Sequence, residues 1–400
     1  MRTGGLRLRL LWMMFSTRVP TDLAPNRLTT AELAIRARGV RLIDLTETNP
    51  TKIGLVYPDG VLAALSAPAG MSYDPHPFGL ASARQTIAGE VSASGLTVDP
   101  SRVILTASTS EAYSFLFKLL CNPGDQVLVP VPSYPLFEHL TRLELVEVRQ
   151  YPLEYHGTWS IDVDALEAAV TPLTRAVLVV SPNNPTGSML ARRDLATLAR
   201  LCASRQLALI GDEVFADYLL DARADAARVL DQDEALTFSL GGLSKSAGMP
   251  QMKLGWIVAG GPATLVEAAL ARLEIVCDAF LSVSTPIQQA AGDLLAAGRQ
   301  IRALIKERIA ENLRDLHALI LQHPSCSVYR VEGGWSAVIR VPAIRPEETL
   351  VLDLLEQDLV LAHPGYFFDF PHEAFVVVSL LPPPGDFRAG VTRLLARASH

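Results

Sequence analysis

Polar and aromatic side chains follow five of the apolar runs in this sequence, each at the point where a run ends. An amide, a carboxylate and an amine among them could bind a small molecule and move its protons. Hydroxyls and an aromatic ring accompany these groups, and they suit an anion and a flat ring respectively. The residues are Ser108, Thr109 and Ser110 after RVILTA (102–107), Tyr134 after QVLVPV (126–131), Asn184 after AVLVV (176–180), Asp212 after LALIG (207–211) and Lys245 after TFSL (237–240).

Each of these residues, taken alone, has an ordinary structural interpretation. Ser108 and Glu111 form the pattern of a helix capping box, Asp212 could cap a helix, and most lysines are solvated. Nucleotide-binding alternatives fail, because the glycine spacing of a P-loop is missing before Lys245 and the sequence has no GxGxxG. The complete set, by contrast, matches the needs of pyridoxal phosphate. That cofactor takes a lysine for its aldehyde, an acid for its pyridine nitrogen, a donor for its phenolic oxygen and a helix N-terminus for its phosphate.

Apolar, β-branched runs alternate with helical patterns along the chain, and this alternation predicts the elements that position the residues above. Near-continuous apolar strands separated by helices are typical of a mostly parallel sheet covered on both faces. Ligand sites in such sheets lie beyond the carboxyl ends of the strands. The expected strands are the five runs above and KLGWIVAG (253–260); the expected helices include 111–120, 162–170 and 193–205, with a largely helical stretch from about 285 to 322.

The sequence predicts an α/β fold with two domains and an N-terminal segment. Residues 51–285 would form the large domain around a mostly parallel central sheet flanked by helices, and residues 286–400 a smaller α+β domain. We expect residues 1–50 to pack with the small domain. Residues 1–13 have two explanations: a secretion signal, or a start codon assigned too early, with Met14 as the true beginning. The second is at least as good, because the apolar run there is shorter than the usual ~7–15 residues of a secretion signal.

The net charge and the spacing of cysteines and histidines argue against several kinds of partner. The 400 residues carry a formal net charge of −7, which argues against a nucleic-acid partner, because such a partner requires a basic face. The four cysteines have no CxxC pair and the eight histidines no metal-ligand spacing, so neither disulfides nor a metal site is expected. No apolar run approaches the ~18 residues of a membrane span. We therefore expect a cytoplasmic protein without membrane, metal or nucleic-acid partners.

The motifs resemble those of the class I/II aminotransferases, which belong to the fold-type I pyridoxal-phosphate enzymes. They occur in the family's order and span about residues 70 to 365. The NPTG segment, the aspartate and the lysine at this spacing are jointly very specific. The matching elements are Tyr73, Pro75 and Gly79, TASTSEA (106–112), PSYP (132–135), NNPTG (183–187), DEVFADY (212–218), GLSKSAGMPQMKLGW (242–256), GGW (333–335) and PG (364–365).

The resemblance implies a role for each candidate residue. Lys245 would form the internal aldimine with pyridoxal phosphate and then move the proton between the substrate Cα and the cofactor. Asp212 would pair with the pyridinium nitrogen, and Tyr134 would stack on the ring. Asn184 would donate a hydrogen bond to the phenolic oxygen, with Asn183 as a turn residue. The phosphate would contact Ser108, Thr109, Ser110 and Lys253, and Tyr73 from the neighbouring subunit, which implies an obligate homodimer with shared active sites.

The sequence departs from the family pattern at four positions. Lys253 stands where the family has a phosphate-binding arginine, so the charge is kept but the bidentate fork is lost. Gly242 lacks the usual hydroxyl, and Phe215 replaces a tyrosine that often assists the phenolic oxygen. Val377, in FVVVS, occupies the position at which the family usually has the arginine that binds the substrate's α-carboxylate.

Another cation must therefore hold that carboxylate, or the substrate is not an ordinary α-amino acid. Lys52 is the first candidate, because the matching family segment lines the substrate pocket. Asn49, from the same segment, and Trp335 are further substrate-binding candidates. Weaker candidates, each more readily explained as a surface charge, are Arg36, Arg340 and Arg388.

The resemblance implies an aminotransferase that works by two half-reactions, with an amino acid as donor and a 2-oxo acid as acceptor. Lyases, decarboxylases and cyclising synthases use the same fold and cofactor residues, and the valine at position 377 raises their odds. A ligand-sensing domain fused to a DNA-binding module is a more distant alternative. It is disfavoured because no such module precedes residue 20 and Lys245 is present.

Overall fold

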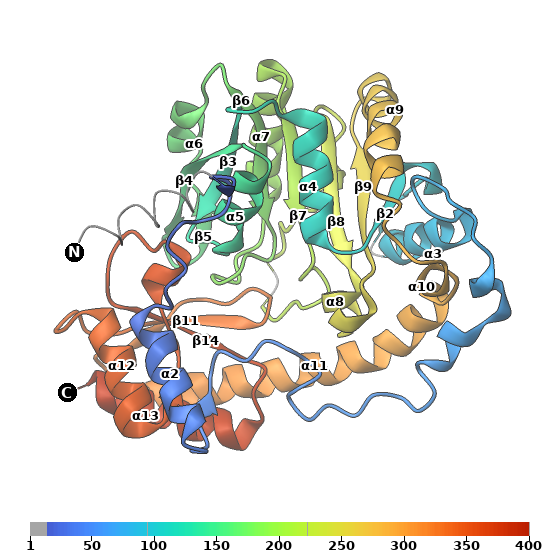
Figure 1. The fold of residues 1–400 in the computed structure, drawn as a ribbon. Helices are drawn as coiled ribbons and strands as arrows, with labels where there is room; N and C mark the ends of the chain where they lie inside the picture. Colours follow the sequence, from blue (N-terminus) through green and yellow to red (C-terminus); the bar gives the residue numbers. More distant parts are fainter. Residues whose placement is uncertain (1–13, 94, 222, 400) are drawn as a thin grey trace.

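An eight-stranded sheet forms the centre of the larger part of the molecule in the computed structural model, which describes residues 14–93, 95–221 and 223–399 (Figure 1). Five consecutive strands of the sheet run parallel to one another: β8, β7, β6, β3 and β4. The outer strands are antiparallel, since β9 runs against both β8 and β2, and β5 runs against β4. The expected mostly parallel α/β sheet is confirmed. In sheet order the strands are β2 (Val103–Thr106), β9 (Gly255–Gly260), β8 (Thr237–Gly242), β7 (Ala208–Asp212), β6 (Thr174–Val180), β3 (Gln126–Val131), β4 (Glu147–Tyr155) and β5 (Trp159–Ile161).

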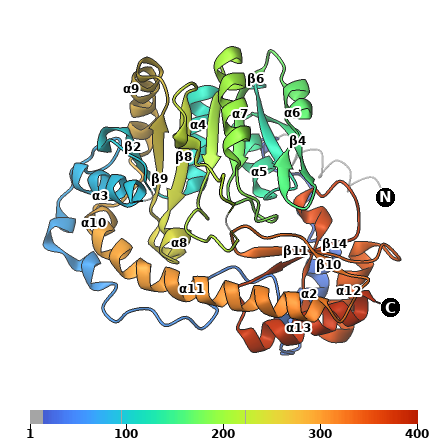
Figure 2. The ribbon, with the colours of Figure 1, turned by 180° about the vertical axis from the view of Figure 1, so that it is seen from behind.

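Helices cover both faces of this sheet, which is why its central strands are apolar along their whole length. In β6, Ala176 and Leu178 pack toward one layer of helices, while Val177 and Val179 pack toward the other. Figures 1 and 2 show the two layers from opposite sides. The first contains α4 (Thr109–Leu120), α5 (Leu136–Leu143) and α9 (Ala263–Phe280); the second contains α3 (Ala81–Ser92), α6 (Val163–Ala169) and α7 (Arg192–Arg205).

A smaller α+β unit lies below the large sheet in Figure 1. Its four-stranded sheet has the order β10-β11-β14-β13, and the helices α12 and α13 pack beside it. The long helix α11 runs beneath the large sheet and into the smaller unit, where it packs on α13 (Figure 2). The bounds are β10 (Ser327–Val328), β11 (Ser336–Arg340), β13 (His363–Pro364), β14 (Phe375–Ser379), α10 (Thr285–Gln289), α11 (Ala291–Ile320), α12 (Glu347–Asp358) and α13 (Pro384–Ala398).

The first described segment of the chain joins this smaller unit. Helix α2 (Arg27–Ala37) packs on α12, and β1 (Ile43–Asp44) pairs with β12 (Val360–Leu361) in parallel. The division of the chain at residues 51 and 286 stays a prediction, and the alternative start before Met14 concerns residues outside the described part.

The four cysteines are free thiols. Burial raises the pKa of Cys121, Cys202 and Cys277 to about 12, which makes these thiols poor nucleophiles. Across the described ranges, no helix is long and apolar enough to cross a membrane, and no cluster of three or more His, Cys, Asp or Glu side chains could hold a metal ion.

Candidate active site

A cavity of about 300 Å³ opens at the carboxyl ends of the central strands, between the large sheet and the start of strand β11 of the smaller unit. Its lining brings together nine of the twelve residues predicted from the sequence. The other three, Tyr73, Lys52 and Asn49, lie outside it. The nine are Ser108, Thr109, Ser110, Tyr134, Asn184, Asp212, Lys245, Lys253 and Trp335.

One end of the cavity is the N-terminus of α4. Ser108 caps this helix, since its Oγ accepts a hydrogen bond from the backbone N–H of Glu111 at 3.2 Å. The Glu111 carboxylate in return accepts from the N–H of Ala107 at 2.6 Å, one residue before the cap. This is close to the predicted capping box, and it leaves the first N–H groups of the helix directed at the cavity. Such a helix start, with the hydroxyls of Thr109 and Ser110, favours an anion.

The strand β9 passes very close to this helix start. A Cβ atom placed on Gly255 would lie 3.0 Å from the carbonyl carbon of Ser108 and 3.2 Å from the nitrogen of Thr109. A side chain at this position would therefore press on the backbone of the helix start, and glycine allows the strand to approach it without a displacement.

The carboxylate of Asp212 ends β7 inside the cavity. Its Oδ2 accepts a hydrogen bond from the Tyr113 hydroxyl at 2.8 Å, and its Oδ1 accepts from the N–H of Val214 at 3.2 Å. Burial raises the pKa of Asp212, while the Tyr113 hydrogen bond, the Val214 N–H and the charge of Lys245 oppose the rise. The pKa of Tyr113 is raised well above its usual value by burial and by the neighbouring carboxylate.

Lys245 lies on the short helix α8 (Leu243–Ser246), which follows β8 directly. Burial lowers the pKa of its amine to about 8, and the negative charge of Asp212 partly opposes the effect. Two aromatic rings flank the amine: Nζ lies 4.7 Å from the ring centre of Trp335 and 5.4 Å from that of Phe215. An amine with this pKa is partly neutral near pH 8, as a nucleophile or a proton carrier requires.

The turn after β6 holds the two adjacent asparagines differently. Asn183 is buried and stabilises the turn, because its Oδ1 accepts from the N–H and the hydroxyl of Thr186 at 3.3 and 3.0 Å. Asn184 faces the cavity, and its Oδ1 accepts from the Ser336 hydroxyl at 3.3 Å. With its amide oxygen used in this way, the Asn184 side chain has its NH2 group free to donate.

Tyr134 and Lys253 line the cavity from loops. The ring of Tyr134 lies edge-on to Phe137 at 6.3 Å, and burial, reinforced by the charge of Asp212, raises the pKa of its hydroxyl. Lys253 has a left-handed backbone, with φ 51°, two residues before β9, and is exposed. Tyr73 is 77% exposed and borders a different hollow together with Leu281.

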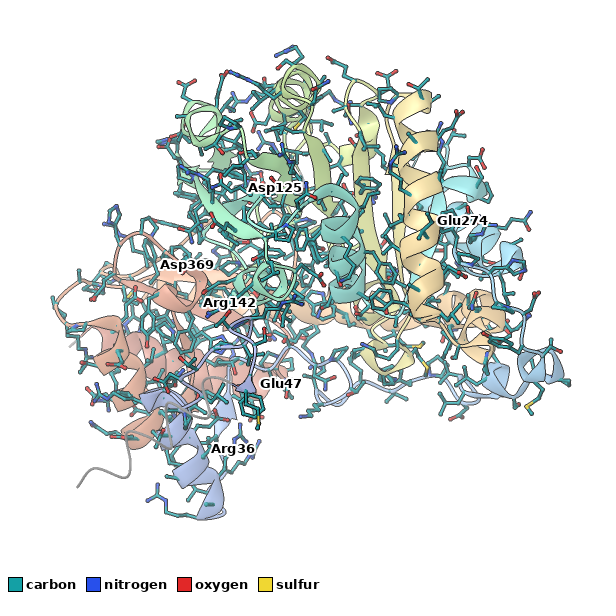
Figure 3. All side chains as sticks on the ribbon, turned by 45° about the horizontal axis from the view of Figure 1, so that its top comes forward. Arg36, Glu47, Asp125, Arg142, Glu274 and Asp369 are labelled. Carbon is teal, nitrogen blue, oxygen red and sulfur yellow. The ribbon has the colours of Figure 1, made fainter. Side chains whose placement is uncertain are left out.

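The four candidate cations for the substrate carboxylate lie outside the cavity lining: two are paired with carboxylates and two are exposed. Lys52 is exposed, and the Asn49 side chain accepts from the N–H and hydroxyl of Thr51. Arg36, on α2 at the bottom of Figure 3, pairs with Glu32 and Asp44. Arg388 pairs with Asp315, and Arg340 is exposed at the end of β11. The positively charged side chains in the cavity lining are Lys245 and Lys253.

Val377 is packed in an apolar cluster. It lies opposite Val338 in the β11–β14 pair and is 3% exposed, among Trp159, Phe368 and Phe370. Ser336 lies on the same face of β11 two residues before Val338 and lines the cavity. The position predicted for the family's carboxylate-binding arginine is thus packed in hydrocarbon.

Several residues at the site were not predicted from the sequence, among them Tyr113, Ser336 and Thr48. Ser336 and Thr48 line the cavity, whereas Tyr113 acts on it through its hydrogen bond to Asp212. Tyr113 lies one helical turn after Thr109, so an i, i+4 search from the hydroxyl cluster would have found it. Ser336 follows the GGW motif directly at the start of an apolar strand. Thr48 comes from the N-terminal segment, where no local pattern distinguishes it.

Comparisons with known proteins agree with this arrangement. The sequence profile described as aminotransferase class I and II matches residues 59–391. The glutamate-pyruvate aminotransferase AlaA of Haemophilus influenzae is 26% identical over 371 residues, which cover 90% of this chain and 92% of that protein. The alanine aminotransferase of Mycobacterium tuberculosis is 27% identical over 370 residues, or 90% and 86% of the two chains. A solved aminotransferase from Escherichia coli matches with a TM-score of 0.84 at 26% identity, covering 96% of this chain and 97% of the other.

Proposed function

The chain belongs to the aminotransferase class I and II family, and from this premise we propose that it transfers an amino group between an amino acid and a 2-oxo acid, using pyridoxal phosphate bound in the cavity described above. The observation that carries the proposal is the joint placement of the α4 N-terminus, Asp212 and Lys245 around one cavity.

The residues present fit this cofactor. A phosphate suits the N-terminus of α4, where unpaired N–H groups and the hydroxyls of Ser108, Thr109 and Ser110 converge near Lys253. Asp212 would hold the proton of the pyridine nitrogen, and the amide of Asn184 would donate to the phenolic oxygen. Tyr134 offers a ring for stacking.

When bound, pyridoxal phosphate supplies an aldehyde that takes up the amino group and a ring that stabilises the electrons left at the substrate carbon. Lys245 would hold the cofactor and then carry the proton removed from the substrate Cα, for which an amine with a pKa of about 8 is suited. Tyr113 and the Val214 N–H donate to Asp212 and favour its ionised form, in which it would pair with the ring nitrogen of the cofactor. The rings of Phe215 and Trp335 exclude water from the amine.

We propose an amino acid with an uncharged side chain as the donor, with alanine tested first. The lining supplies Lys245 and Lys253 as its cations, and both have proposed roles toward the cofactor. The substrate's α-carboxylate therefore has no lining cation of its own, and a second carboxylate, as in glutamate, would add another buried charge without a counter-charge from this subunit, which is unfavourable. Alanine is also consistent with the named activity of the Mycobacterium tuberculosis relative.

We propose a homodimer in which Tyr73 reaches the partner's cavity. Large apolar side chains are exposed along the segment that carries Tyr73 and on the end of α9, namely Val56, Met71, Ile275, Phe280 and Leu281. Tyr73 and Leu281 border one hollow, so these two groups are adjacent. Exposed apolar area of this kind is typical of an interface. Light scattering on the wild type and Ile275→Asp tests it, with Leu321→Asp, on an exposed site at the end of α11, as the control.

A single-turnover measurement tests the reaction. Cofactor-loaded protein is mixed with one amino acid and no acceptor, and the released 2-oxo acid and ammonia are counted. An aminotransferase releases one equivalent of oxo acid per site and no ammonia, and it resumes when a second oxo acid is added. Continuous release of ammonia would instead establish a lyase. Lys245→Ala should remain folded and lose turnover, and substantial remaining transamination would contradict the role of Lys245.

A further inference from the structure

We propose that Tyr218 is a positioning residue for Lys245: it ties the backbone of the lysine turn to the indole of Trp335 and thereby sets how far the amine is shielded from water. The inference rests on the proposed role of Lys245, but its test does not depend on turnover.

Three contacts of Tyr218 converge on these two residues. Its hydroxyl donates to the backbone carbonyl of Lys245 at 2.6 Å. Its ring lies edge-on to that of Trp335, with centroids 4.9 Å apart and an interplanar angle of 71°. Its backbone carbonyl accepts from the N–H of Gly334 at 2.8 Å, one residue before Trp335. Tyr218 is fully buried, so each contact is made in a dry environment, where hydrogen bonds and packing are strongest.

The indole of Trp335 forms one wall around the lysine amine. Its ring centre lies 4.7 Å from Nζ, and it packs edge-on against Phe215, the second flanking ring, at 5.4 Å. These rings cover the amine from two sides, and burial is the main cause of the lowered pKa of Lys245. The other titratable groups that line the cavity, which are left unchanged in the test, are Asp212, Tyr134 and Lys253.

Trp335 comes from the turn that leads into β11, so it belongs to the smaller unit, whereas Lys245 belongs to the large sheet. The turn lies directly on the backbone of Tyr218: a Cβ on Gly333 would be 2.7 Å from the Tyr218 carbonyl oxygen and from Pro182. Leu219 and Gly333 form an antiparallel bridge beside it. Tyr218 therefore fixes the position of the Trp335 ring, which belongs to the smaller unit, relative to Lys245.

Tyr57 provides a matched control. Its hydroxyl donates to the carbonyl of Gly248 at 2.5 Å, in the same turn and three residues after Lys245. Tyr57→Phe removes the same chemical group from the same turn, but from a carbonyl other than that of the lysine. If the substitutions only loosen the turn, both should change the titration midpoint of Lys245. If Tyr218 positions Lys245, only Tyr218→Phe should change it.

The test measures the ionisation of Lys245 in cofactor-free protein. Reductive methylation with ¹³C-formaldehyde labels the five lysines of the chain, and NMR follows each dimethylamine signal against pH. Lys245→Arg identifies the signal of interest. We expect Tyr218→Phe to raise the titration midpoint of the Lys245 amine by roughly half a pH unit to one pH unit. The midpoint moves toward the usual value of a lysine because water gains access to the amine. Tyr57→Phe should leave the midpoint unchanged.

An unchanged midpoint in Tyr218→Phe, or an equal rise in Tyr57→Phe, would overturn the proposal. Trp335→Phe is a second, independent variant: the smaller ring should also raise the midpoint, and no change there would count equally against the proposal. Because the readout is a titration of apoprotein, it decides the positioning role even if Lys245→Ala were to retain transamination and the proposed function failed.

Discussion

The hydroxyl of Tyr113 donates a hydrogen bond of 2.8 Å to Asp212 across the interface between α4 and β7. Both groups are inside the protein, so a neutral phenol supports a buried carboxylate next to Lys245. Tyr113 thus keeps available the negative charge that the site requires, without adding a competing cation.

We predict that Tyr113→Phe destabilises the protein by about 1–3 kcal/mol, because a hydrogen bond to a buried charged group is lost. This hydrogen bond lowers the pKa of Asp212, so its contribution is present where Asp212 is ionised and disappears as the pH falls through the folded-state pKa. Urea unfolding of Tyr113→Phe, Asp212→Asn and the double variant measures the coupling. A coupling energy near zero would show that the two residues do not support each other.

We predict that Gly255→Ala weakens the binding of pyridoxal phosphate about tenfold, roughly 1.4 kcal/mol. The new Cβ would lie 3.0 Å from Ser108 and from Thr106 Oγ1, and so would displace the helix start that binds the phosphate. Equilibrium dialysis gives the dissociation constant. Gly89→Ala is the matched control: it is on α3 with open space around it, and should leave the affinity unchanged while slightly stabilising the helix.

We predict that Val377→Arg does not create a carboxylate-binding site and instead destabilises the protein by about 3 kcal/mol or more. The larger, charged side chain would enter the cluster of Val338, Phe368 and Phe370, which combines overpacking with the burial of a charge. Thermal unfolding reports the loss. A stable variant with a lower KM for amino acids would mean that the cluster can open and that an arginine at this position is functional.

We predict that apo Lys245→Met is more stable than the wild type at pH 7 by on the order of 1–3 kcal/mol, and that the difference shrinks as the pH rises from about 8 toward 10.5. The folded-state pKa of Lys245 is below its unfolded value, so between the two values the unfolded chain binds more protons. Wild-type stability therefore gains with pH in that window, whereas the methionine variant lacks this gain. Parallel slopes for the two proteins would refute the burial of the amine.

The central sheet and most of the cavity lining could be predicted because both depend on local patterns. Apolar runs such as AVLVV identify strands covered on both faces, and Asp212 and Lys245 come directly after such runs. Strand β4 was not predicted, since its side chains are largely exposed near the edge of the sheet and include Glu147 and Arg149. Helix α9 was also missed, although its sequence is a regular helical one.

Contacts between distant segments could not be predicted in the same way. Nothing local to Tyr218 indicates that its hydroxyl meets the lysine carbonyl 27 residues later, or that its ring meets Trp335. Lys52 was chosen from its segment, yet that segment contributes Thr48 to the cavity lining while Lys52 is exposed. Which side chain of a loop turns inward depends on tertiary packing, which a linear pattern does not encode.

Among the tryptophans in the described parts of the chain, Trp335 is the one that lines the cavity; Trp256 lies in the same apolar cluster without lining it, and Trp159 lies in another cluster. An indole 4.7 Å from the lysine amine is an intrinsic fluorophore at the point of binding. Loading of the site with a chromophoric ligand should quench that emission by energy transfer. Occupancy can then be titrated optically, without a label and independently of turnover.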